Sequence, residues 1–176
     1  MCQSTLLYVN IILLFYYVGE FVGAICPRSC HCNESLLRVT CTTAKLDYIP
    51  NTLNPALKEL ILNDNQIKTI QSSLSVYRDL KLFDISNNLI NSLENDYFAQ
   101  NQKIQIIIFN KNNITEINNS TFNKLKSLKE LHIRGNRLAE LGPNSFKALN
   151  KLEHLDLSNN LISKIDRDAF QGLQQL

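Results

Sequence analysis

The sequence predicts a solenoid, a stack of short repeats that together form one parallel β-sheet. The first observation behind this prediction is that one phrase, L-x-x-L-x-L-x-x-N-x-L with Leu, Ile or Phe at the apolar positions, occurs five times. The second is its spacing, because the asparagines that close the phrase recur 23, 24, 24 and 24 residues apart. One repeat cannot bury its own apolar face, whereas stacked repeats share a continuous core. These asparagines, here called the asparagine ladder, are Asn65, Asn88, Asn112, Asn136 and Asn160.

Each repeat should open with a short strand. The x-L-x-L part of the phrase alternates with a period of two, which suits a strand with one buried face. Successive strands should lie parallel and side by side. The repeats span residues 57–79, 80–103, 104–127, 128–151 and 152–175.

The asparagine of each repeat falls where the chain leaves the strand and turns. An unpaired N–H or C=O group buried there would cost roughly 1–3 kcal/mol. An amide side chain both donates and accepts hydrogen bonds, so we expect it to satisfy the neighbouring turns on both sides.

The return half of each repeat carries its own marker, a phenylalanine that recurs every 24 residues. We expect these rings to stack as a phenylalanine spine under the convex side. The first repeat has Ser75 at this offset, so Leu74 or Val76 must fill the space. The spine consists of Phe98, Phe122, Phe146 and Phe170.

The N-terminus differs in kind from the repeats. An apolar run from Leu6 to Val18, followed by the small residues of Val22-Gly23-Ala24, predicts a cleaved signal peptide over residues 1–24. The stretch before the run contains no Lys or Arg. The alternative is a transmembrane anchor, for which the run is short and Glu20 is unfavourably placed.

Four cysteines remain once residues 1–24 are removed. An even number in a secreted chain predicts two disulfides, and the sequence allows three pairings. A zinc site that includes His31 is the alternative, which an oxidising compartment disfavours. We expect residues 25–55 to form a disulfide-stapled cap over the open edge of the first strand, packed by Leu46, Ile49 and Leu53. The cysteines are Cys26, Cys30, Cys32 and Cys41.

Candidate N-glycosylation sites support the secreted interpretation. The N-x-[ST] pattern for N-glycosylation places candidate acceptors at Asn33, Asn113, Asn118 and Asn119, of which the last two overlap.

The end of the sequence falls at the start of a further repeat, because Leu176 occupies the first apolar position of a sixth copy. We therefore expect an N-terminal part of a longer protein. The alternative is a short product whose end is covered by a partner or a second copy.

The outward positions of the strands are candidates for partner binding. Four of them are apolar where solvent would favour polar residues, and an exposed apolar patch commonly marks a protein interface. The alternative is that they only reflect the β-propensity of branched residues. A row of Glu130, His132, Arg134, His154 and Asp156 would form a polar rim or ordinary solvated surface. The apolar patch comprises Ile61, Leu82, Ile106 and Ile108.

Composition and motifs exclude several classes of function. The formal net charge is +2, with Lys and Arg almost balanced by Asp and Glu, so nothing indicates a nucleic-acid surface. No nucleophile elbow, phosphate-binding glycine loop or H-E-x-x-H pattern occurs. His132 and His154 could be neighbours in adjacent strands but lack a clear third ligand. We expect neither catalysis nor a cofactor nor a metal.

The repeats, together with the C-x3-C-x-C-x8-C cluster and the following Leu46-Asp47-Tyr48-Ile49-Pro50, resemble extracellular leucine-rich-repeat proteins from Cys26 to the end of the chain. The resemblance implies an α/β fold, a right-handed horseshoe with the parallel sheet on its concave side and an irregular or short-helical convex side. It also implies the disulfides Cys26–Cys32 and Cys30–Cys41.

A narrower resemblance points to function. The segments 53–57, 65–73, 149–152 and 168–173 look like those of insect cell-surface proteins of the Capricious and Tartan type. This resemblance implies a single-pass membrane protein in cell recognition and adhesion. We expect an extracellular or cell-surface, non-enzymatic binding domain for a protein ligand, a receptor or a second copy, with membrane contact only through a C-terminal anchor. The alternatives are a secreted matrix protein of the small proteoglycan type and an innate-immune or growth-factor receptor.

Overall fold

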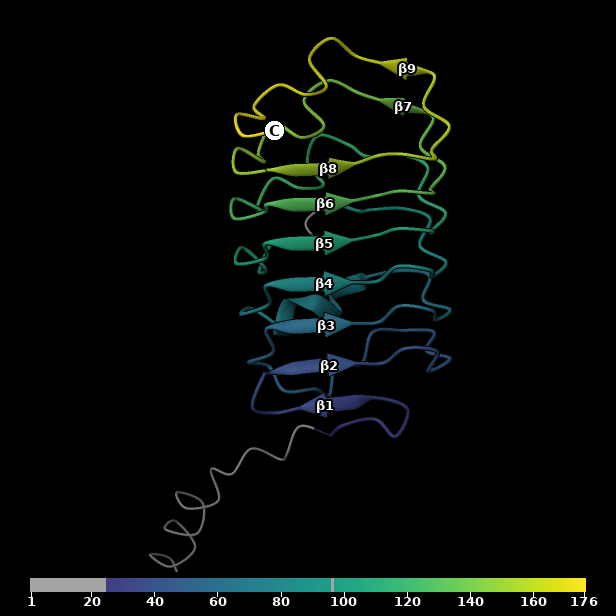
Figure 1. Ribbon diagram of the computed structural model, residues 1–176, viewed down its shortest axis with the longest axis vertical. Coiled ribbons are helices and arrows are strands. Elements are labelled where there is room, and N and C mark those ends of the chain that lie inside the picture. The colour runs from purple at the N-terminus through teal and green to yellow at the C-terminus, as the bar shows by residue number, and fades with distance from the viewer. Residues whose placement is uncertain (1–24, 96) are drawn as a thin grey trace, which may run out of the picture.

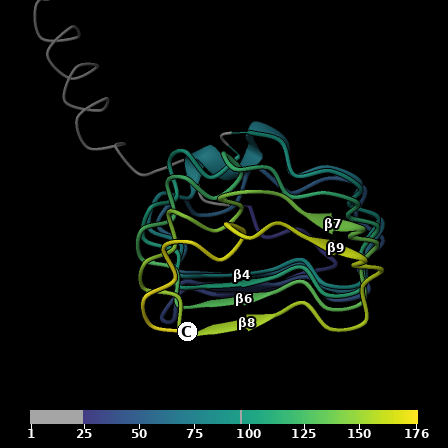
Figure 2. The ribbon, with the colours of Figure 1, turned by 90° about the horizontal axis from the view of Figure 1, so that it is seen from above.

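The computed structural model describes residues 25–95 and 97–176, so the expected signal peptide at residues 1–24 lies outside the described part. The described chain is a right-handed solenoid: each coil runs along a strand at the front, returns behind it and rises by one level (Figures 1 and 2). Within the described residues, no helix combines the length and the apolar character needed to cross a bilayer. The arrangement of the coils confirms the predicted fold class, a solenoid with a parallel sheet.

The front of the solenoid is one sheet with the order β1-β2-β3-β4-β5-β6-β8. From β2 onward all neighbours pair in parallel. In β3 to β6 the central residue is buried and the two flanking residues are half-buried, as the alternating pattern predicts. The repeat strands are β3 (Glu59–Ile61), β4 (Leu82–Asp84), β5 (Ile106–Ile108), β6 (Glu130–His132) and β8 (His154–Asp156).

The cap extends this sheet. Its strands β1 (His31–Asn33) and β2 (Arg38–Thr40) form an antiparallel hairpin, and β2 pairs in parallel with β3. The sequence predicted a cover for the first strand but not a hairpin. Disulfides join Cys26 to Cys32 and Cys30 to Cys41, the pairing that the family resemblance implies.

The asparagine ladder links consecutive coils. The Asn112 amide oxygen accepts a hydrogen bond from the Ile90 N–H at 3.0 Å, and its nitrogen donates to the carbonyls of Ile85 and Phe109, both at 3.0 Å. Ile85 and Ile90 belong to the preceding repeat. The other four asparagines repeat this arrangement, and Asn65 makes it with the cap. The expectation that each amide serves both neighbours is wrong in one respect: each reaches back, and the turn ahead is served by the next asparagine.

The phenylalanine spine is confirmed. The rings of Phe98, Phe122, Phe146 and Phe170 stack with centroids 6.5, 6.3 and 6.0 Å apart. In the first repeat Leu74 is fully buried and fills the space, while Val76 is exposed.

The convex side is largely irregular, as the family resemblance implies, and it carries one short 3-10 helix among the described residues, η1 (Gln71–Val76), in the first repeat. The sequence did not predict a second sheet there. A second sheet pairs β7 (Glu140–Leu141) with β9 (Lys164–Ile165) in parallel, behind the main sheet (Figure 2).

Candidate protein-binding face

The outer face of the main sheet is a grid of side chains. Strand pairing puts Glu59, Leu82, Ile106, Glu130 and His154 in one row across the sheet. A second row contains Ile61, Asp84, Ile108, His132 and Asp156. Residues from five repeats, far apart in the chain, therefore share one surface.

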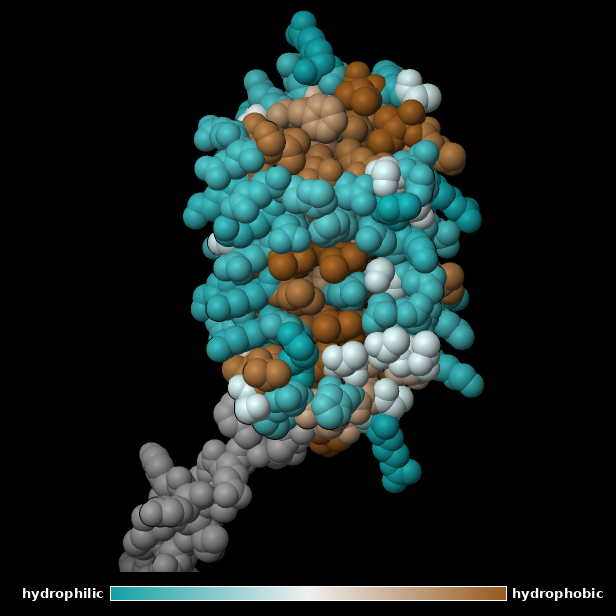
Figure 3. Space-filling view, viewed as in Figure 1, coloured by the Kyte–Doolittle hydropathy of each residue, from teal (hydrophilic) through white to brown (hydrophobic). Residues whose placement is uncertain are grey.

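The apolar patch lies in the middle of this surface. Ile61, Leu82, Ile106 and Ile108 come from the adjacent strands β3, β4 and β5, and all four are half-buried. Figure 3, which views this face, has hydrophobic atoms gathered at the level of these strands, with hydrophilic atoms on both sides. The structure thus brings together the four apolar residues that the sequence singled out.

Asp84 sits inside the apolar patch. It pairs in register with Ile61 on one side and Ile108 on the other. Its Oδ1 accepts hydrogen bonds from the Ser86 N–H at 2.9 Å and the Ser86 hydroxyl at 2.7 Å. This fixed carboxylate gives the patch a polar centre. The sequence did not single out Asp84 as a binding candidate, although the repeat spacing predicts its position between Ile61 and Ile108 in one row.

The predicted polar rim borders the patch on β6 and β8. The rings of His132 and His154 lie 4.9 Å apart, so their expected proximity is real, and His132 Nε2 is 3.4 Å from Glu130 Oε2. Hydrogen bonds from the side chain and backbone of Ser158 hold the pKa of Asp156 below its ordinary value, and Arg134 and His132 add smaller electrostatic contributions. The rim therefore mixes both signs of charge.

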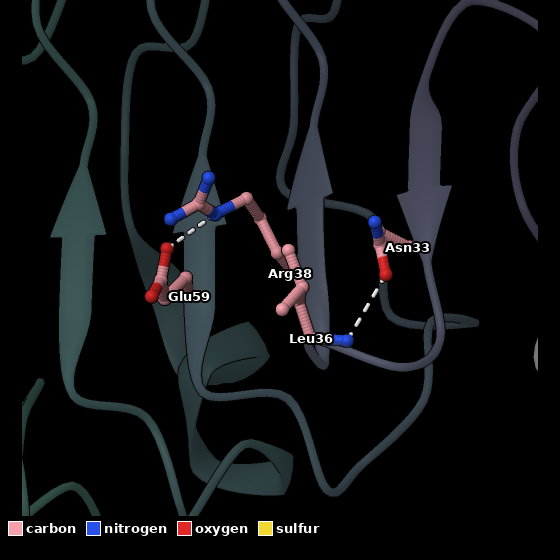
Figure 4. Close-up of polar contacts among 4 residues, drawn as sticks. All are labelled: Asn33, Leu36, Arg38 and Glu59. Atoms are coloured by element: carbon pink, nitrogen blue, oxygen red, sulfur yellow. Dashed lines mark hydrogen bonds and ion pairs between the residues drawn. The ribbon is translucent and has the colours of Figure 1, made fainter.

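The opposite border lies on the cap. Arg38 on β2 forms an ion pair with Glu59 on β3, and this carboxylate raises the pKa of the Arg38 guanidinium. In the neighbouring strand, Asn33 Oδ1 accepts a hydrogen bond from the Leu36 N–H at 3.0 Å and so closes the β1–β2 turn (Figure 4). Both borders of the apolar patch are charged, as expected for the periphery of a protein interface.

The described residues contain no group of three or more His, Cys, Asp or Glu side chains placed to hold a metal ion. His132 and His154 form a pair without a third ligand in this part of the chain.

Comparison with known proteins settles the family. The leucine rich repeat family matches residues 78–138 and 126–176, which together make up more than half of the 176 residues. The chain belongs to the leucine-rich repeat family. The human oligodendrocyte-myelin glycoprotein is 35% identical over 82 residues, which cover 47% of this chain and 18% of that relative. The bovine leucine-rich repeat-containing protein 3B is 34% identical over 95 residues, which cover 53% of this chain and 34% of that relative.

This leucine-rich repeat chain thus spans less than two thirds of the length of these relatives. They support the broad family resemblance, and the narrower likeness to Capricious and Tartan stays an expectation.

The candidate glycan acceptors differ in their exposure and hydrogen bonding. Asn119 is exposed and Asn113 is half-buried. Asn118 Oδ1 accepts hydrogen bonds from the Ser120 and Thr121 N–H groups at 3.2 and 3.1 Å.

Proposed function

We propose that this chain is a non-enzymatic, extracellular protein-binding domain whose outer sheet face, the concave face of the leucine-rich-repeat horseshoe, holds a protein partner. The observation that carries the proposal is the apolar patch on β3, β4 and β5, with charged residues on both sides of it. Interface centres are depleted in charge while their rims are polar, and this face has that layout except for Asp84, whose carboxylate accepts two hydrogen bonds from Ser86. The cap disulfides support an oxidising, extracellular setting.

We further propose that the domain belongs to a cell-surface recognition or adhesion protein of the Capricious and Tartan type. Such a domain would bind an extracellular ligand, a receptor or a second copy of itself. A transmembrane segment in the full-length transcript would support this proposal. A transcript that encodes a secreted matrix protein would contradict it, and one that encodes a cytoplasmic signalling domain would favour a receptor instead.

Replacing Ile108 with aspartate is expected to abolish partner binding and leave folding intact. Ile108 is half-buried at the surface, whereas its neighbour Ile107 is fully buried in the core, so the substitution puts a charge into the patch but not into the core. Next to Asp84 it also sets two carboxylates against each other and against an apolar partner. The tetramerised chain is screened against arrayed extracellular proteins, itself included, and the variant is tested on every protein that the wild type binds.

Gln66→Asp is the matched control, because it adds the same charge at an exposed residue outside the apolar patch. It should bind like the wild type. Both variants should melt at the wild-type temperature. Undiminished binding by a folded Ile108→Asp variant would remove this patch from the binding face, and a wild-type chain that binds none of the arrayed proteins would count against the proposal as a whole.

A further inference from the structure

Positive charge is concentrated along one edge of the solenoid, although the net charge of the chain is small. In every repeat, three positions border the first apolar residue: the two before it and the one after it. Because the repeats stack, these positions form one strip beside the N-terminal ends of the strands, on the left in Figure 1. The strip, here called the basic edge, has seven cations and two carboxylates. The cations are Lys58, Arg78, Lys81, Lys103, Lys126, Lys129 and Lys151.

The imbalance is local. The basic edge carries a net charge of +5, while the whole chain carries +2, so all remaining residues together carry −3. All seven cations are exposed. At the level of β3 to β8, the left margin of Figure 3 is hydrophilic. The fold thus collects on one edge a positive charge that the rest of the surface does not share.

Backbone hydrogen bonds align the edge from one repeat to the next. The Lys81 N–H donates to the Lys58 carbonyl at 2.7 Å, and two further steps through Gln105 reach Lys129 with bonds of 2.8 Å each. Adjacent strands lie about 4.8 Å apart, so the five repeats extend the basic edge over about 19 Å. The edge therefore runs along the solenoid from repeat to repeat.

Both carboxylates of the edge are already paired within it. Lys103 Nζ lies 2.5 Å from Asp79 Oδ1, and Lys129 Nζ lies 2.7 Å from Glu153 Oε1. The Lys103 ammonium holds the pKa of Asp79 below its ordinary value, with smaller contributions from Lys58 and Lys81. Among the described residues, no carboxylate lies within ion-pairing distance of the other five cations, Lys58, Arg78, Lys81, Lys126 and Lys151.

We propose that the basic edge binds a linear sulfated polysaccharide of the glycosaminoglycan class. A linear polyanion laid along the axis meets cations from successive repeats. The edge positions include no aromatic residue, so they offer no stacking platform for bases. They also lack the apolar centre that a protein interface needs. Six of the seven cations are lysines, flexible point charges that respond to charge density more than to the planar geometry that arginine recognises.

The test compares two triple variants of the full chain that lose equal charge. Lys81→Ala/Lys126→Ala/Lys151→Ala removes three unpaired cations from the edge. Lys68→Ala/Arg137→Ala/Arg167→Ala removes three exposed cations elsewhere. Binding to immobilised heparin is measured over a series of salt concentrations. We expect the affinity of the edge variant for heparin to fall by at least about tenfold. Its salt dependence should also be shallower, because fewer counterions are released from the polyanion.

The control variant should bind heparin like the wild type, and so should Ile108→Asp, which tests the separate concave face. Chemically desulfated heparin should bind weakly to all variants. Equal heparin binding by the two triple variants would overturn the proposal, as would equal binding of native and desulfated heparin. A wild-type chain that binds phosphatidylserine vesicles but not heparin would assign the edge to a membrane surface instead.

Discussion

Replacing Asn112 with alanine is expected to lower the free energy of unfolding by about 3–5 kcal/mol, since it leaves one buried N–H group unpaired, at roughly 1–3 kcal/mol, and removes hydrogen bonds to two buried carbonyls, at roughly 0.5–1.5 kcal/mol each. The Ile90 N–H loses its acceptor, and the carbonyls of Ile85 and Phe109 each lose one of two amide donors, the other being Nδ2 of Asn88 and of Asn136, respectively. Asn112 is 5% exposed, so water reaches these groups poorly. Chemical denaturation monitored by circular dichroism measures the loss.

Asn150→Ala is the matched control. Asn150 is exposed, and this substitution should change stability by no more than about 0.5 kcal/mol. If Asn112→Ala were equally mild, the asparagine ladder would contribute to regularity of the repeat and not to stability.

The second large effect is expected in the phenylalanine spine. Phe122→Ala should lower the free energy of unfolding by about 3–5 kcal/mol, the usual range for removing a buried phenylalanine. Its side chain is 1% exposed and lies between the rings of Phe98 and Phe146, with centroids 6.5 and 6.3 Å away. The cavity would open between three coils at once, and the same denaturation experiment would register it.

Phe170→Ala provides the comparison within the spine. Phe170 stacks on Phe146 at 6.0 Å but is 41% exposed, so less apolar surface leaves the core. We expect a smaller loss than for Phe122→Ala. Equal losses would show that stacking on one neighbour, and not burial between two, determines the contribution of each ring.

The repeat period made much of the structure predictable. Once the spacing is known, every residue has a place on a strand, a turn or the convex side, and this is why the apolar patch, the contact between His132 and His154, and the phenylalanine spine could be expected. The same logic fails where a repeat departs from its pattern. Asn101 is fully buried at a position that Leu125 and Leu149 occupy in later repeats.

The structure explains this departure. Asn101 Nδ2 donates to the carbonyls of Leu74 and Tyr77, both at 2.9 Å, at the end of the 3-10 helix η1. In turn, the Tyr77 hydroxyl donates to the Pro50 carbonyl in the cap, and burial raises the pKa of Tyr77 to about 12. Asn101 pairs with a helix that the described residues of the other repeats lack, so the repeating apolar pattern could not predict it.

The basic edge escaped prediction for a different reason. The net charge of +2 is a sum over the whole chain, so it does not show where on the surface the charges lie. Cations that are 20 or more residues apart in the sequence become neighbours only when the coils stack. The cap hairpin was also missed, because its strands, β1 and β2, lie before the first repeat and no recurring phrase marks them.

The backward reach of the asparagine amides gives the solenoid a direction in time. During synthesis the cap leaves the ribosome first, and domains generally begin to fold from the N-terminus. The Ile67 N–H is satisfied only when Asn88 arrives, 21 residues later, and the Ile90 N–H waits in the same way for Asn112. Each coil of the nascent chain is therefore completed by hydrogen bonds with the coil that follows it. Every coil before the most recent one is then fully paired, and the next coil packs on a structure that is already formed except for its last coil.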